Sequence, residues 1–144
     1  MNRLKLFAFL LLLPLLCFSG AGGQQGVLAT LRGANFNITT DQAMVVPATI
    51  TRWAPTAIWV TNCSISMTLA AGGVYPATAK GGTALVAATQ LYSAATSGTV
   101  IVNAALAAGI ATTAQTGNTV YLSLTTAQGA AATCDVYVIG VDLS

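Results

Sequence analysis

The sequence predicts an all-β protein: a single antiparallel β-sandwich of about eight strands, jelly-roll-like, that follows an N-terminal hydrophobic signal segment. Short runs rich in Thr, Val, Ile and aromatic residues recur along the chain, as they do in strands. Clusters that contain Gly and Asn separate these runs and are typical of turns. Regularly spaced short strands are typical of sandwiches and barrels. We expect one domain over residues 24–144, because a chain of 144 residues fits a single core.

Residues 1–23 have the organisation of an export signal. Arg3 and Lys5 precede an unbroken apolar run over residues 6–18, and small residues follow it. A helix over this run is about 20 Å long, which is shorter than the roughly 30 Å core of a bilayer. We therefore expect a cleaved signal peptide and a periplasmic or extracellular protein, which contacts the membrane only if the segment is not cleaved. The alternatives are a lipoprotein signal at Cys17 and a wrongly assigned start codon.

The strands are predicted from the apolar runs in chain order. The candidates are residues 26–31, 42–46, 49–53, 57–69, 84–91, 99–102, 119–125 and 134–142. The last two are expected to form a hairpin, because the connection between them is short and contains Gly. Residues 103–109 are expected to form a short helical turn, since Asn suits its start and Gly its end.

Residues 57–69 show the clearest alternation. Trp59 and Cys63 fall on a mostly apolar parity, whereas the other parity turns polar from Asn62 onward. Such a period of two indicates a strand with one buried face. We therefore expect Trp59 to point into the core, and a bend near Asn62 because the run is long for one strand. Residues 134–142 are apolar on both parities, which predicts a central or doubly covered strand.

Cys63 and Cys134 remain after signal cleavage, and both lie on the apolar parity of a predicted strand. An even pair in an exported chain favours a disulfide. Closing a loop of about 70 residues would stabilise the fold by about 4 kcal/mol. The alternative is two small buried thiols in the core. We expect no metal site, because two cysteines without His do not form a zinc site.

The composition argues against catalysis and against nucleic-acid binding. Hydrophobic residues make up 55% of the chain and charged residues 6%, and His and Glu are absent. General acid–base enzymes mostly use His or Glu, and phosphate binding needs clustered Lys and Arg. Without the signal segment, three basic and three acidic side chains balance to zero. We expect a non-enzymatic protein without a cofactor, whose neutral surface suits self-association or a larger protein assembly.

Three residues are candidate partner contacts: Trp53, Tyr75 and Lys80. Tyr75 and Lys80 lie between two Gly-Gly pairs, in a connection expected to be an exposed loop. Trp53 precedes an expected tight turn over residues 54–56, and it fits either the core or an exposed platform. The alternative function is an exported module that recognises a glycan or a protein partner through Trp53, Tyr75 or Tyr92. Asp41 follows two threonines and is expected to cap a turn.

Three stretches carry a resemblance to other proteins. They are RGANFNITTDQA at residues 32–43, AGGVY through KGGTALV at residues 71–86, and LSLTTAQGA running into DVYV at residues 122–138. Together they resemble a group of small, mostly uncharacterised bacteriophage and prophage proteins of the virion-associated type. The resemblance implies a structural role, such as head decoration or a tail component, and carries no catalytic motif. The export-type N-terminus departs from this pattern, because phage virion proteins normally assemble in the cytoplasm.

Overall fold

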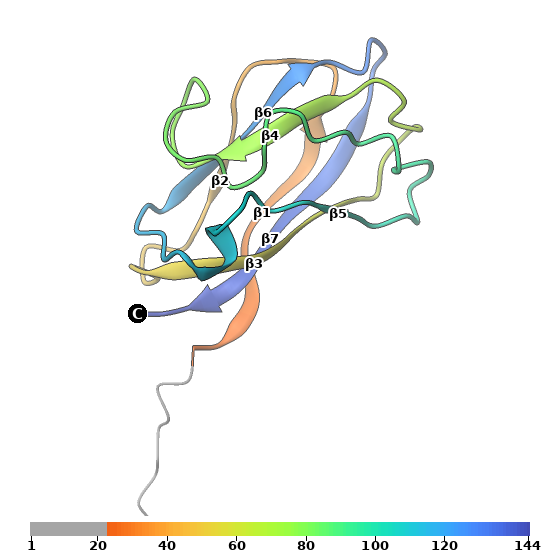
Figure 1. The fold of residues 1–144 in the computed structure, drawn as a ribbon. Helices are drawn as coiled ribbons and strands as arrows, with labels where there is room; N and C mark the ends of the chain where they lie inside the picture. The colour runs from red at the N-terminus through yellow and green to blue at the C-terminus, as the bar shows by residue number, and fades with distance from the viewer. Residues whose placement is uncertain (1–22) are drawn as a thin grey trace, which may run out of the picture.

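The computed structural model describes residues 23–144, so the predicted signal segment lies outside the described residues. The elements in chain order are β1 (Gln25–Asn35), β2 (Gln42–Val45), β3 (Trp53–Thr61), β4 (Ala71–Tyr75), β5 (Val102–Ala104), the 3₁₀ turn η1 (Ile110–Thr112), β6 (Thr119–Thr126) and β7 (Thr133–Asp142). The strands form two sheets with the orders β1-β7-β3-β5 and β2-β6-β4, in which every pairing is antiparallel (Figure 1). The predicted nearly all-β architecture with antiparallel sheets is confirmed.

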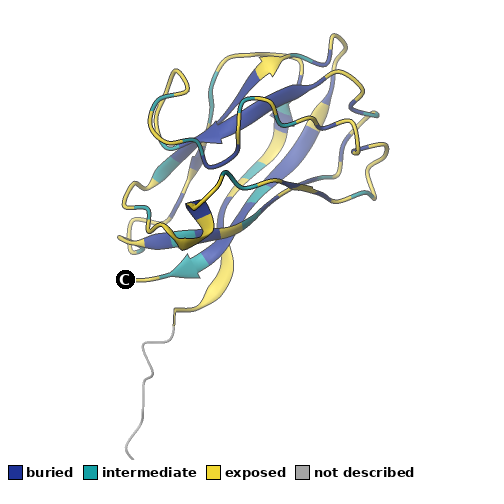
Figure 2. Ribbon diagram, in the orientation of Figure 1, coloured by how far each residue is buried: buried dark blue, intermediate teal, exposed yellow. Residues whose placement is uncertain are grey.

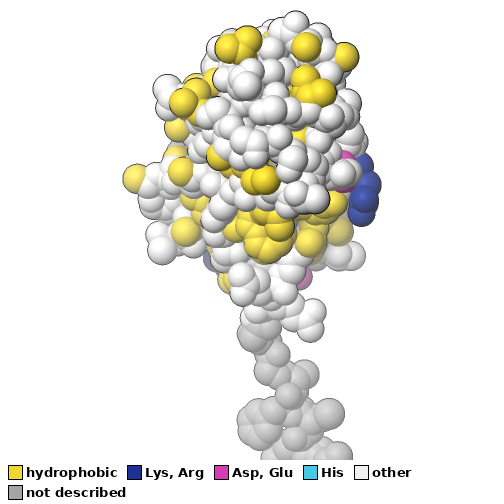
Figure 3. Space-filling view, turned by 90° about the vertical axis from the view of Figure 1, so that its right-hand side faces the viewer, with side chains coloured by type: hydrophobic (Ala, Val, Ile, Leu, Met, Phe, Trp, Pro, Cys, Tyr) yellow, Lys and Arg dark blue, Asp and Glu magenta, His cyan; other side chains and the backbone are white. Residues whose placement is uncertain are grey.

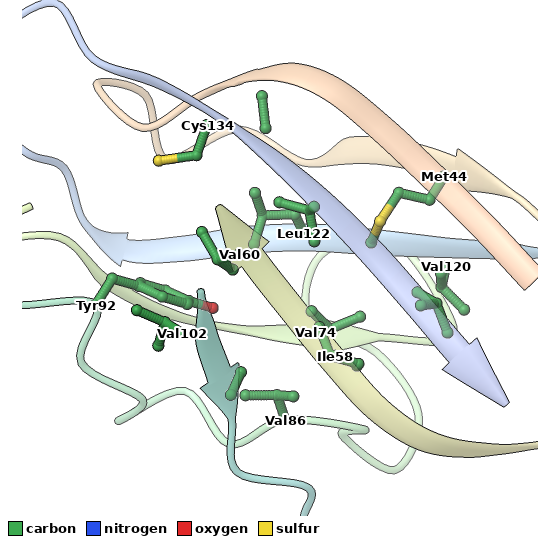
Figure 4. Packing of buried hydrophobic residues seen from close by; sticks show 14 of the residues in the cluster. Met44, Ile58, Val60, Val74, Val86, Tyr92, Val102, Val120, Leu122 and Cys134 are labelled. Atoms are coloured by element: carbon green, nitrogen blue, oxygen red, sulfur yellow. The ribbon is translucent and has the colours of Figure 1, made fainter. Parts of the chain in front are cut away.

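The core lies between the two sheets. Alternate residues of the central strands are fully buried, whereas the loops are largely exposed (Figure 2). Figure 4 shows side chains from both sheets, among them Met44, Ile58 and Leu122, meeting in the space between the layers. Burying each large aliphatic side chain stabilises the fold by about 1.5–3 kcal/mol relative to leaving it exposed. Hydrophobic burial between the sheets therefore supplies the main stabilising term.

β7 is a central strand, as its two apolar faces predicted. It pairs with β1 on one side and with β3 on the other. Val136 and Val138 are completely buried in the core. Tyr137 and Ile139 lie on the opposite face of the same strand, because side chains alternate along it. The second apolar face of this strand therefore lies on the outside of the sandwich.

The prediction that Trp59 points into the core is wrong. Ile58 and Val60 are completely buried, and Trp59 between them is 39% exposed. The strand ends at Thr61, and the backbone at Asn62 has a positive φ of 52°, which confirms the predicted bend. The alternation after the bend therefore belongs to a different segment and does not determine which way Trp59 points.

The predicted hairpin between the last two strands is also wrong. β6 pairs with β2 and β4, whereas β7 pairs with β1 and β3. The connection between them crosses from one sheet to the other. Its buried residue Gln128 accepts hydrogen bonds from the N–H groups of Leu69 and Ala70 at 3.0 and 3.2 Å. These hydrogen bonds hold the crossing connection against the segment that precedes β4.

β4 was not predicted, because its sequence AGGVY has weak strand propensity. The two glycines are required by close approach to neighbouring backbone. A Cβ at Gly73 would clash with the Val86 carbonyl oxygen, and a Cβ at Gly72 would clash with the Leu124 backbone. The Gly-Gly pair therefore marks a buried strand here and not the start of a loop.

Three further predictions differ from the structure. Residues 49–52 form turns and bends, so only Trp53 of the predicted 49–53 strand is in β3. Residues 84–91 contribute isolated bridges at Val86 and Leu91 only. The helical turn predicted over 103–109 is wrong, because β5 occupies its start and η1 follows its end. Gly109, at φ 79°, precedes η1 and does not terminate a helix.

Candidate functional site

The outer face of the β1-β7-β3-β5 sheet carries a row of four aligned side chains. Thr30, Tyr137, Trp59 and Asn103 are consecutive partners across the four strands. The residues on either side of Tyr137, Trp59 and Asn103 in their strands are buried, so these three point outward. Directly opposite residues have Cβ atoms about 4.5–5.5 Å apart. Two neighbouring aromatic side chains are therefore flanked by a hydroxyl and an amide.

An open hollow of about 440 Å³ lies beside Trp59. Its lining side chains are Val27, Ala57, Trp59 and Ile139, with Gln25 and Thr56 as the polar members. The Gln25 amide nitrogen donates a hydrogen bond of 3.2 Å to the Thr56 hydroxyl. Figure 3 shows hydrophobic side chains gathered above the start of the described chain, with a basic group beside an acidic one at the edge. The hollow itself has no ionisable side chain in its lining.

Asp135 organises the backbone next to the aromatic row. Its buried carboxylate accepts hydrogen bonds from the Gly33 N–H at 2.8 Å and from the Asn62 amide at 3.2 Å. Arg32 lies 3.9 Å from the same carboxylate, and its guanidinium carbon is 6.0 Å from the Tyr137 ring centroid. The Arg32 side chain is 76% exposed, so water screens this ion pair. Asp135 therefore serves the fold by fixing the irregular part of β1.

The two residues of the expected contact loop, Tyr75 and Lys80, lie in different environments, the first in the core and the second on the surface. Tyr75 belongs to β4 and is 5% exposed, and burial raises the pKa of its hydroxyl. Lys80 is exposed in a tight turn over residues 78–81, where Ala79 and Lys80 have positive φ values of 55° and 59°. Such values are strained for residues other than Gly. The Asp41 carboxylate accepts a 2.6 Å hydrogen bond from the Ala79 N–H, so Asp41 caps this distant turn, 38 residues along the chain, and not a turn at its own position.

We expect Asp41→Asn to weaken the acid sensitivity of the fold. The Ser123 hydroxyl, the Ala79 N–H and nearby Lys80 hold the pKa of Asp41 below its ordinary value of 3.8. A lowered folded-state pKa stabilises the protein above pH 3.8, and this stabilisation is lost as the pH falls through the folded value. Thermal melts followed by circular dichroism should therefore show a lower melting temperature for the variant at neutral pH. The variant should also show a smaller decline than the wild type under acid conditions, and parallel acid profiles would contradict the capping role.

Trp53 and Tyr92 are buried and contribute to the core. Trp53 is 1% exposed, and its indole nitrogen donates a 2.8 Å hydrogen bond to the Gly117 carbonyl. Tyr92 is completely buried, and its hydroxyl donates to the Gly72 carbonyl at 3.1 Å. Its ring packs edge-on against Phe36 at a centroid distance of 5.2 Å, and burial raises the pKa of its hydroxyl far above the ordinary range. Neither side chain presents an aromatic face to a partner.

Cys63 and Cys134 form a disulfide, which confirms the predicted pairing over two free thiols. The bond joins the segment after β3 to the start of β7, across a sequence separation of 71. Two hydrogen bonds lie beside it: the Ser64 N–H donates to the Thr133 carbonyl at 2.8 Å, and the Thr133 N–H donates to the Ser64 hydroxyl at 3.0 Å. The disulfide therefore closes a local contact between neighbouring strands of one sheet.

Within residues 23–144, no group of three or more His, Cys, Asp or Glu side chains is placed to hold a metal ion. The part of the chain that the structure describes also has no helix long and apolar enough to cross a membrane. Comparisons with protein-family models, with curated proteins and with solved structures found no match. The function proposed below is therefore argued from the geometry and the sequence of this chain.

The sequence prediction missed the outer-face residues Val27, Tyr137 and Ile139 and placed Trp59 on the wrong side. The sequence contained one indication of this outer apolar face. The apolar second parity of residues 134–142 required either a covering layer or an exposed apolar face. In the structure this face is only partly exposed: Tyr137 is half-buried and Ile139 is buried, although the other sheet covers only the opposite side of β7.

Proposed function

We propose that the protein is a non-enzymatic structural subunit that self-associates or assembles into a larger particle. The observation that carries this proposal is the balance of apolar and charged groups on the surface. The described residues contain only six charged side chains. They expose nine large hydrophobic side chains: Val27, Ile38, Val45, Trp59, Ile65, Leu69, Leu91, Ile101 and Leu143. Such a surface gives little electrostatic repulsion between copies and offers apolar contact area.

The edges of the two sheets support the same proposal. Of the four edge strands, β2, β4 and β5 contain no charged residue, and β1 contains only Arg32. Val45 in β2 is 63% exposed, and Ile101 directly before β5 is 59% exposed. Proteins usually protect an exposed edge with Lys, Pro or a covering segment, because its free backbone groups can pair with another chain. Uncharged edges with apolar neighbours favour contact between copies.

We further propose that the topology is a jelly roll with an eighth strand near Val86. The chain alternates between the sheets from β1 to β7, which gives the orders β1-β7-β3-β5 and β2-β6-β4. Val86 forms an antiparallel bridge with Val74 of β4, next to the three-stranded sheet. A strand at this position would give each sheet four strands and would complete two Greek keys. This architecture is common among capsid and lectin domains.

We propose that the protein is exported to the periplasm or the extracellular space, with a phage-related particle as the alternative location. The resemblance of residues 32–142 to virion-associated proteins favours the particle, and the pattern of residues 1–23 favours export. The disulfide supports an oxidising compartment. Fractionation of cells that carry the gene tests both parts, with detection by peptide mass spectrometry. Recovery in purified particles would support the virion role, whereas recovery only as free periplasmic or extracellular protein would contradict it. The mass of the N-terminal peptide should show cleavage near Gly23.

A further inference from the structure

We infer that the hollow beside Trp59 is a binding site for a neutral saccharide. This inference does not depend on self-association through the sheet edges, because it uses the outer face of the β1-β7-β3-β5 sheet and not the free backbone groups of β2 and β5. It also differs from the glycan-binding alternative that the sequence suggested, because Trp53, Tyr75 and Tyr92 are all buried. The chemistry, the size and the rigidity of the hollow all fit such a ligand.

The lining matches the two kinds of surface that a sugar ring presents. A saccharide has an apolar C–H face that packs on an aromatic ring, and a rim of hydroxyl groups that donate and accept hydrogen bonds. Trp59 supplies the exposed aromatic surface, and Val27 and Ile139 add aliphatic contacts. Gln25 and Thr56 supply neutral hydrogen-bonding groups at the same hollow. Their mutual hydrogen bond uses one amide N–H, so the amide oxygen and the hydroxyl proton are available to a ligand.

The lining of the hollow has no charged side chain, and this favours a neutral ligand. No Lys, Arg, Asp or Glu lines it, so neither a phosphate nor an acidic sugar would find a cation there. A purely apolar ligand would leave the polar pair formed by Gln25 and Thr56 without ligand contacts. A neutral polyol uses both parts of the lining. Trp59 lines the hollow and also belongs to the row of Thr30, Tyr137, Trp59 and Asn103, so a second sugar unit on that row would meet another aromatic side chain and further neutral polar groups.

The size and rigidity of the site fit a small ligand. Its volume of about 440 Å³ lies within the range of about 300–1,000 Å³ found for small-molecule sites. Trp59 and Ala57 lie on β3 and Ile139 on β7, and these strands pair along most of their length. Side chains on paired strands are held more precisely than those on loops. The aromatic platform is therefore formed before any ligand arrives.

Tryptophan fluorescence tests the inference with a panel of neutral oligosaccharides: cellotetraose, maltotetraose and N,N′-diacetylchitobiose. Trp59 is exposed and should respond to a bound sugar, whereas buried Trp53 should give a constant background. We expect a saturable change in emission with at least one probe, with a dissociation constant in the millimolar range. Trp59→Ala should abolish binding, Gln25→Ala should weaken it about tenfold, and Trp59→Tyr should restore part of it. Thr39→Ala, an exposed change in the connection between β1 and β2, is the control and should leave binding unchanged.

Three outcomes would overturn the inference. One is a flat response to every probe, and another is unchanged binding by Trp59→Ala as measured by calorimetry. The third is dissociation of an oligomer by Trp59→Ala in light scattering, which would assign this face to contact between copies. That last result would support the proposed self-association while removing the saccharide site, so the two proposals fail separately. Circular dichroism melts establish that each variant is folded.

Discussion

Reduction of the Cys63–Cys134 disulfide is expected to destabilise the protein by about 4 kcal/mol, because the bond removes the closure entropy of a long loop from the unfolded chain. In a domain of this size, the loss corresponds to a fall in melting temperature of about 10–20 °C. Urea unfolding with and without dithiothreitol measures the effect. The slope of the transition should also change, because the reduced unfolded chain exposes more surface.

The double variant Cys63→Ala, Cys134→Ala is the control for this experiment. It should resemble the reduced wild type in stability and should not respond to dithiothreitol. A wild-type protein with the same urea midpoint under oxidising and reducing conditions would contradict a stabilising role for the bond. Reductant sensitivity in the double variant would show that the reagent acts elsewhere.

Replacement of Gln128 by Ala is expected to cost about 1–3 kcal/mol, because it leaves the buried Ala70 N–H without a partner and removes three part-buried hydrogen bonds. The Gln128 amide oxygen accepts from the N–H groups of Leu69 and Ala70. Its amide nitrogen donates to the Ser66 carbonyl at 3.2 Å and to the Thr68 hydroxyl at 3.1 Å. A single side chain thus makes four hydrogen bonds to residues 66–70, before β4, and holds the crossing from β6 to β7 against them. Chemical denaturation monitored by circular dichroism gives the free energy of unfolding.

Two further variants separate this network from side-chain volume. Gln128→Glu keeps the shape and the acceptor oxygens but loses both donors, so it should also destabilise the fold at neutral pH. Gln24→Ala removes an exposed amide and should change stability by less than about 0.5 kcal/mol. If Gln128→Ala and Gln24→Ala had equal effects, the crossing would not depend on the Gln128 amide.

The sequence predicted the elements whose signal is local. The all-β architecture followed from the short strand-like runs, and the central position of β7 followed from its two apolar parities. The disulfide followed from cysteine count and parity. Each of these properties depends on residues close together in the chain or on a simple count.

The errors arise where long-range contacts override the local pattern. Residues 57–60 are Ala, Ile, Trp and Val, so both parities are apolar and the alternation carries no information about direction. The polar positions that suggested a direction lie after the bend at Asn62. β4 was missed because its glycines are selected by contact with Val86 and Leu124, which are far away in the sequence. The hairpin was wrong because short connections also join strands in opposite sheets.

The candidate site was the least predictable feature for the same reason. The row that contains Trp59 and Tyr137 exists only when β3 and β7 pair in the observed register, and no local pattern specifies that register. Tyr75 and Trp53 looked available because they flank turn-like sequence. Both are buried, since β4 lies beneath the Val86 segment and the Trp53 indole reaches the Gly117 carbonyl.

The central claim is that the protein works as an assembling subunit and not as an isolated monomer. Multi-angle light scattering on the mature protein, with its N-terminus established by mass spectrometry, tests this claim most directly. We predict a mass of several chains that persists at moderate dilution. This mass should change little with salt, because apolar and backbone contacts dominate the contact between copies. A monomeric mass at every concentration up to the solubility limit would contradict it.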